Sequence, residues 1–416
     1  MTLSSNQSRG RIVLGAVLIQ LALGAIYAWP AFTPSLEEAG WTKAQTQSVF
    51  ASGLAFFALV MVFAGRLMPK IGPRKLAILG GIVLGVGYIL AGLVGGSSLP
   101  LLILFIGVIG GSGIGLAYVV PIAVGMRWFP DKKGLITGLA VAGFGFGAMF
   151  WVKIAGSWGG FILGLGLNRT FLIYGILFLV MVELGGIWMV FPPDGWKPEG
   201  WIPPSSATGR AALGVNFRSG EMLRRPQFYM IFLTFVFSSG AGLMTIGLMK
   251  LFPKEALQAM GYSPLEASAL AGTAMAIFFS LANGFGRIIW GMLSDLLGRK
   301  PSVFLMCVTQ GLFMIVFVKM AGTPGLLFLG SALIGFNFGG NFALFPTLTA
   351  DTFGAEHIGQ LYGWVFLAYG VGGILGPVLG GRLGDMGNFP LAFFLCGGLC
   401  LLGAIISVMI KAPRSA

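Results

Sequence analysis

Long apolar segments alternate with short polar ones along the whole of this chain. A helix needs ~20 apolar residues to cross the ~30 Å of hydrocarbon in a bilayer. Segments that meet this length recur from the first residues to the last, which predicts an all-α membrane protein. We expect twelve transmembrane helices, at residues 12–34, 44–65, 76–96, 100–127, 134–157, 169–192, 226–251, 264–293, 302–320, 324–347, 357–381 and 388–410.

One polar segment is longer than the other loops, and it divides the predicted helices into six and six. Residues 193–223 are rich in proline, glycine, serine and charged residues. We therefore expect a six-helix bundle at residues 1–192, a linker at 193–223 and a second six-helix bundle at 224–416.

The composition supports the membrane prediction. Hydrophobic residues make up 56% of the chain and charged residues 9%, against about 25% charged residues in soluble domains. The net charge of +13 would suggest a nucleic-acid partner in a soluble protein. Here the basic residues cluster in short loops, where they specify topology, and we expect no nucleic-acid partner.

The positions of Lys and Arg predict the orientation. With the N-terminus inside, 18 of the 26 basic residues fall on inner segments and seven on outer ones. Because loops on the cytoplasmic side carry the excess of Lys and Arg, both termini and the linker are expected in the cytoplasm. We expect the protein in the inner (plasma) membrane of the cell, with the lipid bilayer as its surroundings.

Glycine patterns of the first half recur in the second half. Gly65–Gly72 (GRLMPKIG) is echoed 226 positions later by Gly291–Gly298 (GMLSDLLG). Four glycines within residues 134–147 are echoed 225 positions later within residues 359–372. Two duplicated six-helix halves place a substrate site between them, near the middle of the membrane.

Arg287 lies in a strongly apolar stretch, Ala274–Ile289, with no acidic residue within a helical turn. A guanidinium cannot lose its proton, and a charge at the bilayer centre costs ~2.5–3.5 kcal/mol or more. We expect Arg287 to face a water-filled cavity or an anionic ligand and to bind a substrate carboxylate. The alternative is a structural arginine that extends to water, because the loop motif at Gly291 begins only four residues later.

That loop motif carries a family resemblance. Twelve predicted helices, a duplicated half and the sequence Gly291–Lys300, which fits G-x-L-x-D-x-x-G-R-K, resemble the major facilitator superfamily. In that family the loop aspartate pairs with basic groups and helix ends as a cytoplasmic latch, which implies that role for Asp295, Arg299 and Lys300. The first-half copy has Pro69 where the acid would stand, which implies a weaker or different latch there. The alternative is that these loop charges only specify topology.

A narrower resemblance extends over nearly the whole chain. Arg127–Leu135 (RWFPDKKGL), Ser219–Phe228 (SGEMLRRPQF) and Tyr27–Pro30 (YAWP) are similar to the branch of oxalate/formate antiporters and monocarboxylate transporters. This implies transport of small carboxylates such as lactate, pyruvate, formate or oxalate. It also matches Arg287 to the arginine with which the family binds the substrate carboxylate.

Departures from the family pattern bear on coupling and specificity. Asn283 stands one turn before Arg287, where proton-coupled animal relatives have an aspartate; the amide cannot titrate but could bind the substrate or only pack between helices. Ala31 replaces a lysine that those relatives carry just after the equivalent of Pro30. Tyr369 replaces a lysine of the oxalate exchanger, and one buried cation instead of two favours a monocarboxylate.

The remaining candidates are aromatic. Tyr118 matches a tyrosine of the oxalate exchanger and could donate to the carboxylate, or be satisfied by a backbone carbonyl. Phe366, three residues before Tyr369, could line the pocket with it, or both could be core residues. Tyr27 and Phe338 are further candidates for substrate contact.

These features predict a secondary active transporter of small monocarboxylates such as L-lactate or pyruvate, which works by alternating access. We expect proton coupling, a functional monomer and no cofactor or metal, with the proton as the possible co-transported ion. The alternatives are exchange of one carboxylate for another, a carrier for another organic anion, and a channel. An enzyme is not expected, because no metal cluster, catalytic triad or phosphate-binding loop is present in the sequence. Glu183, the only acid deep within a predicted helix, is expected to contact a neighbouring helix or the interface.

Overall fold

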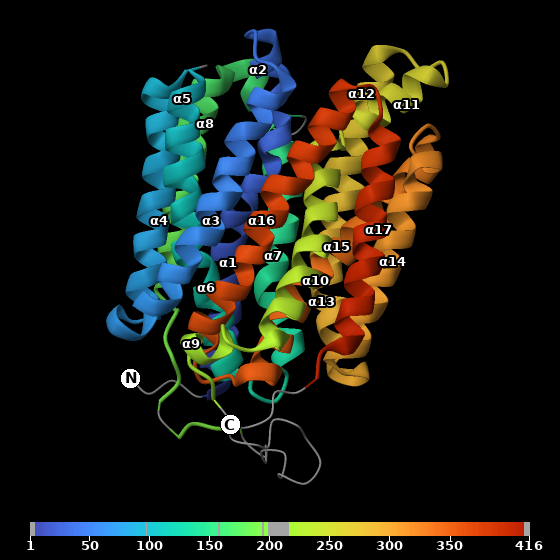
Figure 1. The fold of residues 1–416 in the computed structure, drawn as a ribbon. Coiled ribbons are helices and arrows are strands. Elements are labelled where there is room, and N and C mark those ends of the chain that lie inside the picture. Colours follow the sequence, from blue (N-terminus) through green and yellow to red (C-terminus); the bar gives the residue numbers. More distant parts are fainter. Residues whose placement is uncertain (1–4, 97, 157–158, 194, 199–215, 412–416) are drawn as a thin grey trace.

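The computed structural model describes residues 5–96, 98–156, 159–193, 195–198 and 216–411, and within these ranges every regular element is a helix (Figure 1). Twelve of its helices are long and apolar enough to cross a membrane, which confirms the predicted fold class. The first half contains α1 (Ser5–Leu23), η1 (Gly24–Ala31), α2 (Thr33–Glu38), α3 (Lys43–Ile71), α4 (Pro73–Leu90), η2 (Ala91–Gly95), α5 (Leu99–Leu102), η3 (Ile103–Gly110), α6 (Gly111–Trp128), α7 (Lys133–Ala155) and α8 (Phe161–Gly186). The second half contains α9 (Ser219–Met222), α10 (Pro226–Leu248), α11 (Phe252–Ala259), α12 (Pro264–Thr273), η5 (Ala274–Phe279), α13 (Ser280–Leu297), α14 (Arg299–Met320), α15 (Pro324–Phe353), α16 (Ile358–Asp385) and α17 (Phe389–Met409).

Several spans change helical type part-way. The first consists of α1 followed by η1, a 3₁₀ segment that contains Pro30. The eighth consists of α12, the π-helical segment η5 and α13, and at the junction the Ser280 hydroxyl donates to the Met275 carbonyl oxygen at 2.9 Å. Such π-helical segments often occur at functional sites, and this one directly precedes the helix that carries Arg287.

Some helices extend further than the hydropathy pattern predicts. Helices α3, α13 and α15 continue four to six residues past the expected ends and stop at Gly72, Gly298 and Gly354, which have φ values of 85°, 91° and 99°. Glycine adopts this left-handed backbone without strain, so a glycine at the end of each of these helices can terminate it. Hydropathy reports where the hydrocarbon ends, whereas the glycine cap decides where the helix ends.

The predicted bounds of the sixth span, residues 169–192, are wrong at both ends. Helix α8 covers Phe161–Gly186 and contains a kink at Gly166, which has a φ of 77°. Arg169, which suggested a loop, lies within the helix with an exposed side chain. Because the kinked helix continues through Arg169, the charge of this residue placed the predicted start of the helix too far along the chain.

The two halves contact each other along two crossing helix pairs, α3 with α16 and α7 with α13. A Cβ added to Gly291 would lie 2.4 Å from the carbonyl oxygen of Gly134, and one added to Gly65 would lie 2.1 Å from that of Gly359. These four positions are the ones that echo each other in the sequence. The repeated glycines therefore let the backbones of the two halves touch at equivalent places.

We call the end of the bundle that carries Arg66, Lys70, Arg127, Lys133 and Arg299 the basic end; α9 lies there, at the bottom of Figure 1. Residues 194 and 199–215 of the expected linker lie outside the described residues. The boundaries predicted at residues 192 and 224 therefore stay predictions.

Candidate functional site

Arg287 is completely buried at the contact between the halves. Its Nε donates to Asn283 Oδ1 at 3.1 Å on the same helix, and its Nη1 donates to the Val141 carbonyl oxygen of α7 at 3.0 Å. Its Nη2 is buried without a hydrogen-bond partner. The side chain does not extend to water, so the alternative of a snorkelling arginine does not describe its geometry.

The glycines of α7 bring the halves together at Arg287. A Cβ added to Gly138 would lie 2.2 Å from the Arg287 carbonyl oxygen, and one added to Gly145 would lie 2.7 Å from the backbone nitrogen of Gly284. No side chain fits in either place. The close approach of these backbones leaves the Val141 carbonyl within reach of the guanidinium.

Aromatic rings of both halves flank the guanidinium. Its central carbon lies 3.9 Å from the centre of the Phe342 ring on α15 and 5.3 Å from that of Phe144 on α7. Rings at such distances attract a cation through their negative faces. Among the described residues, Arg287 is the single charged side chain in the buried class and forms no ion pair. The rings and the Val141 carbonyl thus offset part of the cost of burying its charge.

Two tyrosines meet across the interface beside this cation. The hydroxyl oxygens of Tyr27 on η1 and Tyr369 on α16 are 2.8 Å apart and form a hydrogen bond. The Tyr27 ring also contacts Phe144 and Phe338, with centroid separations of 5.0 and 5.8 Å. The structure therefore brings Tyr27, Tyr369 and Phe338 together around one point.

Tyr118 of α6 completes the enclosure from the first half. Its ring lies 5.2 Å from that of Phe366 and 4.9 Å from that of Phe57. Its hydroxyl is buried without a hydrogen-bond partner, although it lies close enough to Arg287 for the charge to act on it. The backbone carbonyl that would satisfy a purely structural tyrosine is absent from its surroundings in the described chain.

Asn283 and Tyr362 add unpaired polar groups to the same region. The Asn283 side chain accepts from Arg287, while its Nδ2 is buried without a partner. Tyr362 of α16 contacts Phe366 with ring centroids 5.6 Å apart, and its hydroxyl is also unpartnered. Buried polar atoms are usually paired, and exceptions in one cluster point to a site that a ligand completes.

The seven expected site residues are therefore close together, and three further residues join them. Sequence reasoning did not single out Phe144, Phe342 and Tyr362. Each is one of many aromatic residues in apolar helices, so the sequence holds no local signal for it. Counting back 226 positions from Arg287 leads to Met61, so the repeat supplies one cation and not two.

The expected latch lies at the basic end. Asp295 accepts from the backbone nitrogens of Gly134 and Leu135 at 3.2 and 3.1 Å, and from Arg299 Nη1 at 2.7 Å. Arg299 also donates to Asp351 Oδ2 at 2.8 Å. The Asp295 carboxylate thus lies on the first turn of α7 and joins the halves, with Lys300 next to Arg299 at the start of α14.

Glu183 lies apart from this site. It is on α8, half-buried, and its Oε1 would lie 2.9 Å from a Cβ added to Gly81 of α4. This is the inter-helix contact expected for it.

Comparison with known proteins agrees with this geometry. The model of the Major Facilitator Superfamily matches residues 12–280 and 257–416. The chain belongs to the major facilitator superfamily. It is a multi-pass membrane transporter and not an enzyme, as the sequence predicts. The major facilitator fold is also that of the proton:xylose symporter XylE, which matches with a TM-score of 0.69 and 14% identity over 98% of this chain and 97% of that one.

Two relatives within the superfamily are carboxylate carriers by name. The oxalate:formate antiporter of Oxalobacter formigenes is 26% identical over 92% of this chain and 87% of its own length. The apicoplast pyruvate carrier 1 of Toxoplasma gondii is 26% identical over 76% of this chain and 66% of its own length.

Proposed function

We propose that this transporter carries small monocarboxylates such as L-lactate or pyruvate by alternating access. The observation that carries the proposal is Arg287, a buried and permanent cation at the contact between the halves with one nitrogen unpartnered. A guanidinium presents two parallel N–H donors that match the two oxygens of a carboxylate. Sites between the halves of such transporters are reached when one half moves against the other.

The unpaired polar atoms around Arg287 fit one carboxylate. Arg287 Nη2, Asn283 Nδ2 and the Tyr118 hydroxyl are all donors without partners, and an ionised carboxylate accepts at about four positions. The aromatic rings beside them would enclose the short carbon chain of the substrate. A hydroxyl or keto oxygen next to the carboxylate would accept a hydrogen bond from whichever of these donors the carboxylate does not use.

The number of buried charges favours a monocarboxylate. One carboxylate and Arg287 make a neutral pair, whereas oxalate would bring a second negative charge that no other buried side chain of the described residues balances. Burying an unbalanced charge is costly. Two relatives support a monocarboxylate substrate: one is named as a pyruvate carrier, and the other exchanges oxalate for formate, which is itself a monocarboxylate.

Coupling to a proton is part of the proposal. No aspartate, glutamate or histidine is in the buried class among the described residues, so the proton would travel on the substrate carboxyl group itself or on an acid outside that class. The Phe342 ring and the Val141 carbonyl would hold the guanidinium while the carrier returns without substrate. A carrier that can return in this way does not need a counter-substrate.

Exchange of carboxylates is the second candidate, and the antiporter relative favours it. In this mode the positive charge of Arg287 would block the return of the unloaded carrier. For either mode we place the basic end in the cytoplasm and the protein in the plasma membrane as a monomer, because the excess of Lys and Arg marks the cytoplasmic side.

Uptake of labelled L-lactate into proteoliposomes tests the proposal. An inward proton gradient should stimulate uptake into vesicles that contain no carboxylate. Uptake that requires preloaded formate or oxalate would support exchange instead. No L-lactate or pyruvate uptake in either arrangement would contradict the monocarboxylate assignment.

A further inference from the structure

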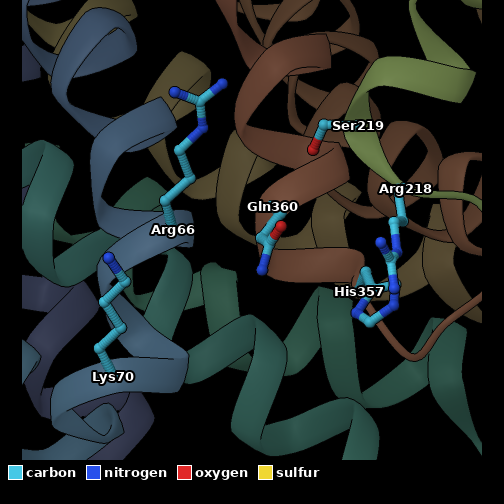
Figure 2. Close-up of a pocket in the computed structure, with 6 residues that line it drawn as sticks. All are labelled: Arg66, Lys70, Arg218, Ser219, His357 and Gln360. Carbon is cyan, nitrogen blue, oxygen red and sulfur yellow. The ribbon is translucent and has the colours of Figure 1, made fainter.

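A second feature of the molecule lies at the basic end, separate from Arg287. A cavity of about 430 Å³ opens there between the last turns of α3, the segment at α9 and the first turn of α16. Figure 2 shows the side chains that line it, which come from both halves and from the start of α9. They are Arg66, Lys70, Arg218, Ser219, His357 and Gln360.

The lining is basic and has no acidic member. Arg66, Lys70 and Arg218 form no ion pair within the described part of the chain. The nearest acids in the sequence bond to neutral groups: Glu221 accepts from the Arg218 backbone nitrogen at 2.6 Å, and Glu356 accepts from Asn216 Nδ2 at 2.8 Å. Three basic side chains thus line one cavity, of which Arg66 also lies over the Trp364 ring, with 5.1 Å between its central carbon and the ring centre.

The internal repeat explains why a negative group is missing here. Asp295 of the second half accepts hydrogen bonds from backbone nitrogens in the first turn of α7, which belongs to the first half, and from Arg299. The equivalent of Asp295 in the first half is Pro69, and the equivalent of α7 is α16. Helix α16 begins without a side-chain cap, and its first turn borders the cavity through Gln360. The first-half copy therefore has its helix end but not its carboxylate, and Pro73 stands at the position of Arg299. The basic residues beside this helix end, Arg66 and Lys70, come from other positions of α3.

We propose that this cavity binds a phosphate group, which supplies the missing negative charge and joins the two halves at the basic end. Arginine forks and a lysine ammonium are the usual ligands of phosphate oxygens. The Ser219 hydroxyl oxygen is buried without a partner in the lining, so it is available to donate a further hydrogen bond. Three cations exceed what a single carboxylate would balance, which favours phosphate over the transported substrate.

The phosphate could belong to a soluble anion or to a lipid headgroup, because both present the same oxygens. Bound between Arg66 of α3 and His357 before α16, it would stabilise the arrangement in which the basic end is closed. Transport would then slow as the site fills, since the halves must separate at this end in each cycle. This inference does not depend on which substrate Arg287 binds.

Thermal unfolding of the purified full-length protein tests the site. Inorganic pyrophosphate, compared with potassium chloride at equal ionic strength, should raise the unfolding midpoint of the wild type. Arg66→Gln and Arg218→Gln should each weaken the apparent affinity about tenfold or more, the size expected for loss of a charged hydrogen bond. Lys75→Gln is the matched control, because Lys75 is an exposed basic residue of the same end outside the cavity lining.

Nanodiscs distinguish the source of the phosphate. If a lipid headgroup fills the cavity, phosphatidylglycerol discs should raise the midpoint above that in phosphatidylcholine discs, and the same two variants should lose the rise. Pro69→Asp places a carboxylate beside the cavity and should abolish the response to pyrophosphate while the protein stays folded. Equal responses in all variants, or no response beyond that of salt in either arm, would overturn the proposal.

Discussion

The hydroxyl groups of Tyr27 and Tyr369 form a hydrogen bond of 2.8 Å although the two residues are 342 positions apart and belong to different halves. They lie beside Arg287, the buried cation to which we assign the substrate. Any movement that separates the halves at this depth must break this bond. In the proposed site, Tyr369 would therefore both hold the halves together and contact the substrate.

Tyr369→Lys should shift specificity from monocarboxylates toward oxalate. A lysine here adds a second buried cation, so the site would balance two carboxylates instead of one. Competition of unlabelled oxalate against L-lactate uptake measures the change. Tyr369→Phe keeps the ring and removes only the hydroxyl, and should leave the preference unchanged. Stronger inhibition by oxalate in the Phe variant, or none in the Lys variant, would refute the role of charge count.

Tyr118→Phe should separate stability from transport. The Tyr118 hydroxyl is buried without a partner, so its removal should leave the unfolding midpoint unchanged or raise it. The half-saturating concentration of L-lactate should rise several-fold, because a donor to the carboxylate is lost.

Tyr174→Phe provides the contrast to Tyr118→Phe. The Tyr174 hydroxyl donates to the Trp151 carbonyl oxygen within the first half, away from Arg287. Removing it should cost about 1–3 kcal/mol of stability and leave the half-saturating concentration unchanged. If Tyr118→Phe behaved like Tyr174→Phe, Tyr118 would be a core residue.

Asp295→Asn should favour opening of the basic end. The carboxylate joins Arg299 and the first turn of α7, and a negative charge at a helix start contributes about 0.3–2 kcal/mol. Spin labels at the exposed positions Lys132 and Leu297 report the separation of the halves. A larger population at long distance is expected in the variant. An unchanged distance distribution would mean that these charges specify topology only.

Gly291→Ala tests the backbone contact between the halves. An added Cβ would lie 2.4 Å from the Gly134 carbonyl oxygen, which cannot move without displacing α7. The basic end should no longer close, and the transport rate should fall strongly. Gly398→Ala in α17 is the control, since nothing lies within 4 Å of a Cβ there, and it should transport normally. Normal transport by Gly291→Ala would contradict the contact.

Much of the fold follows from the sequence because a bilayer imposes a simple rule. Length and hydropathy predict all twelve spans, and the echoes of Gly65 and Gly134 predict the duplicated halves. The prediction failed where local backbone geometry decides the end of a helix, as at Gly72, Gly298 and Gly354. The kink at Gly166 in α8 likewise has no hydropathy signal.

Without the family resemblance, which led to Tyr118 and Tyr369, the site was predictable only where a residue conflicts with its surroundings. Arg287 stood out because a charge in an apolar helix is costly and rare. Phe144 and Phe342 contact its guanidinium, but a phenylalanine in an apolar helix conflicts with nothing, so the sequence gives no reason to select it. The basic cavity was equally hidden, because its residues come from three distant segments and each alone is an ordinary topology signal.

Equilibrium binding of labelled L-lactate to purified wild type and Arg287 variants tests the central claim most directly. Arg287→Lys keeps the charge but loses the fork, and Arg287→Gln loses both. We predict binding weakened about tenfold or more in the first and abolished in the second, with the Arg382→Gln control unchanged because Arg382 is exposed on α16. Wild-type affinity in a folded Arg287→Gln protein would show that this arginine does not hold the substrate.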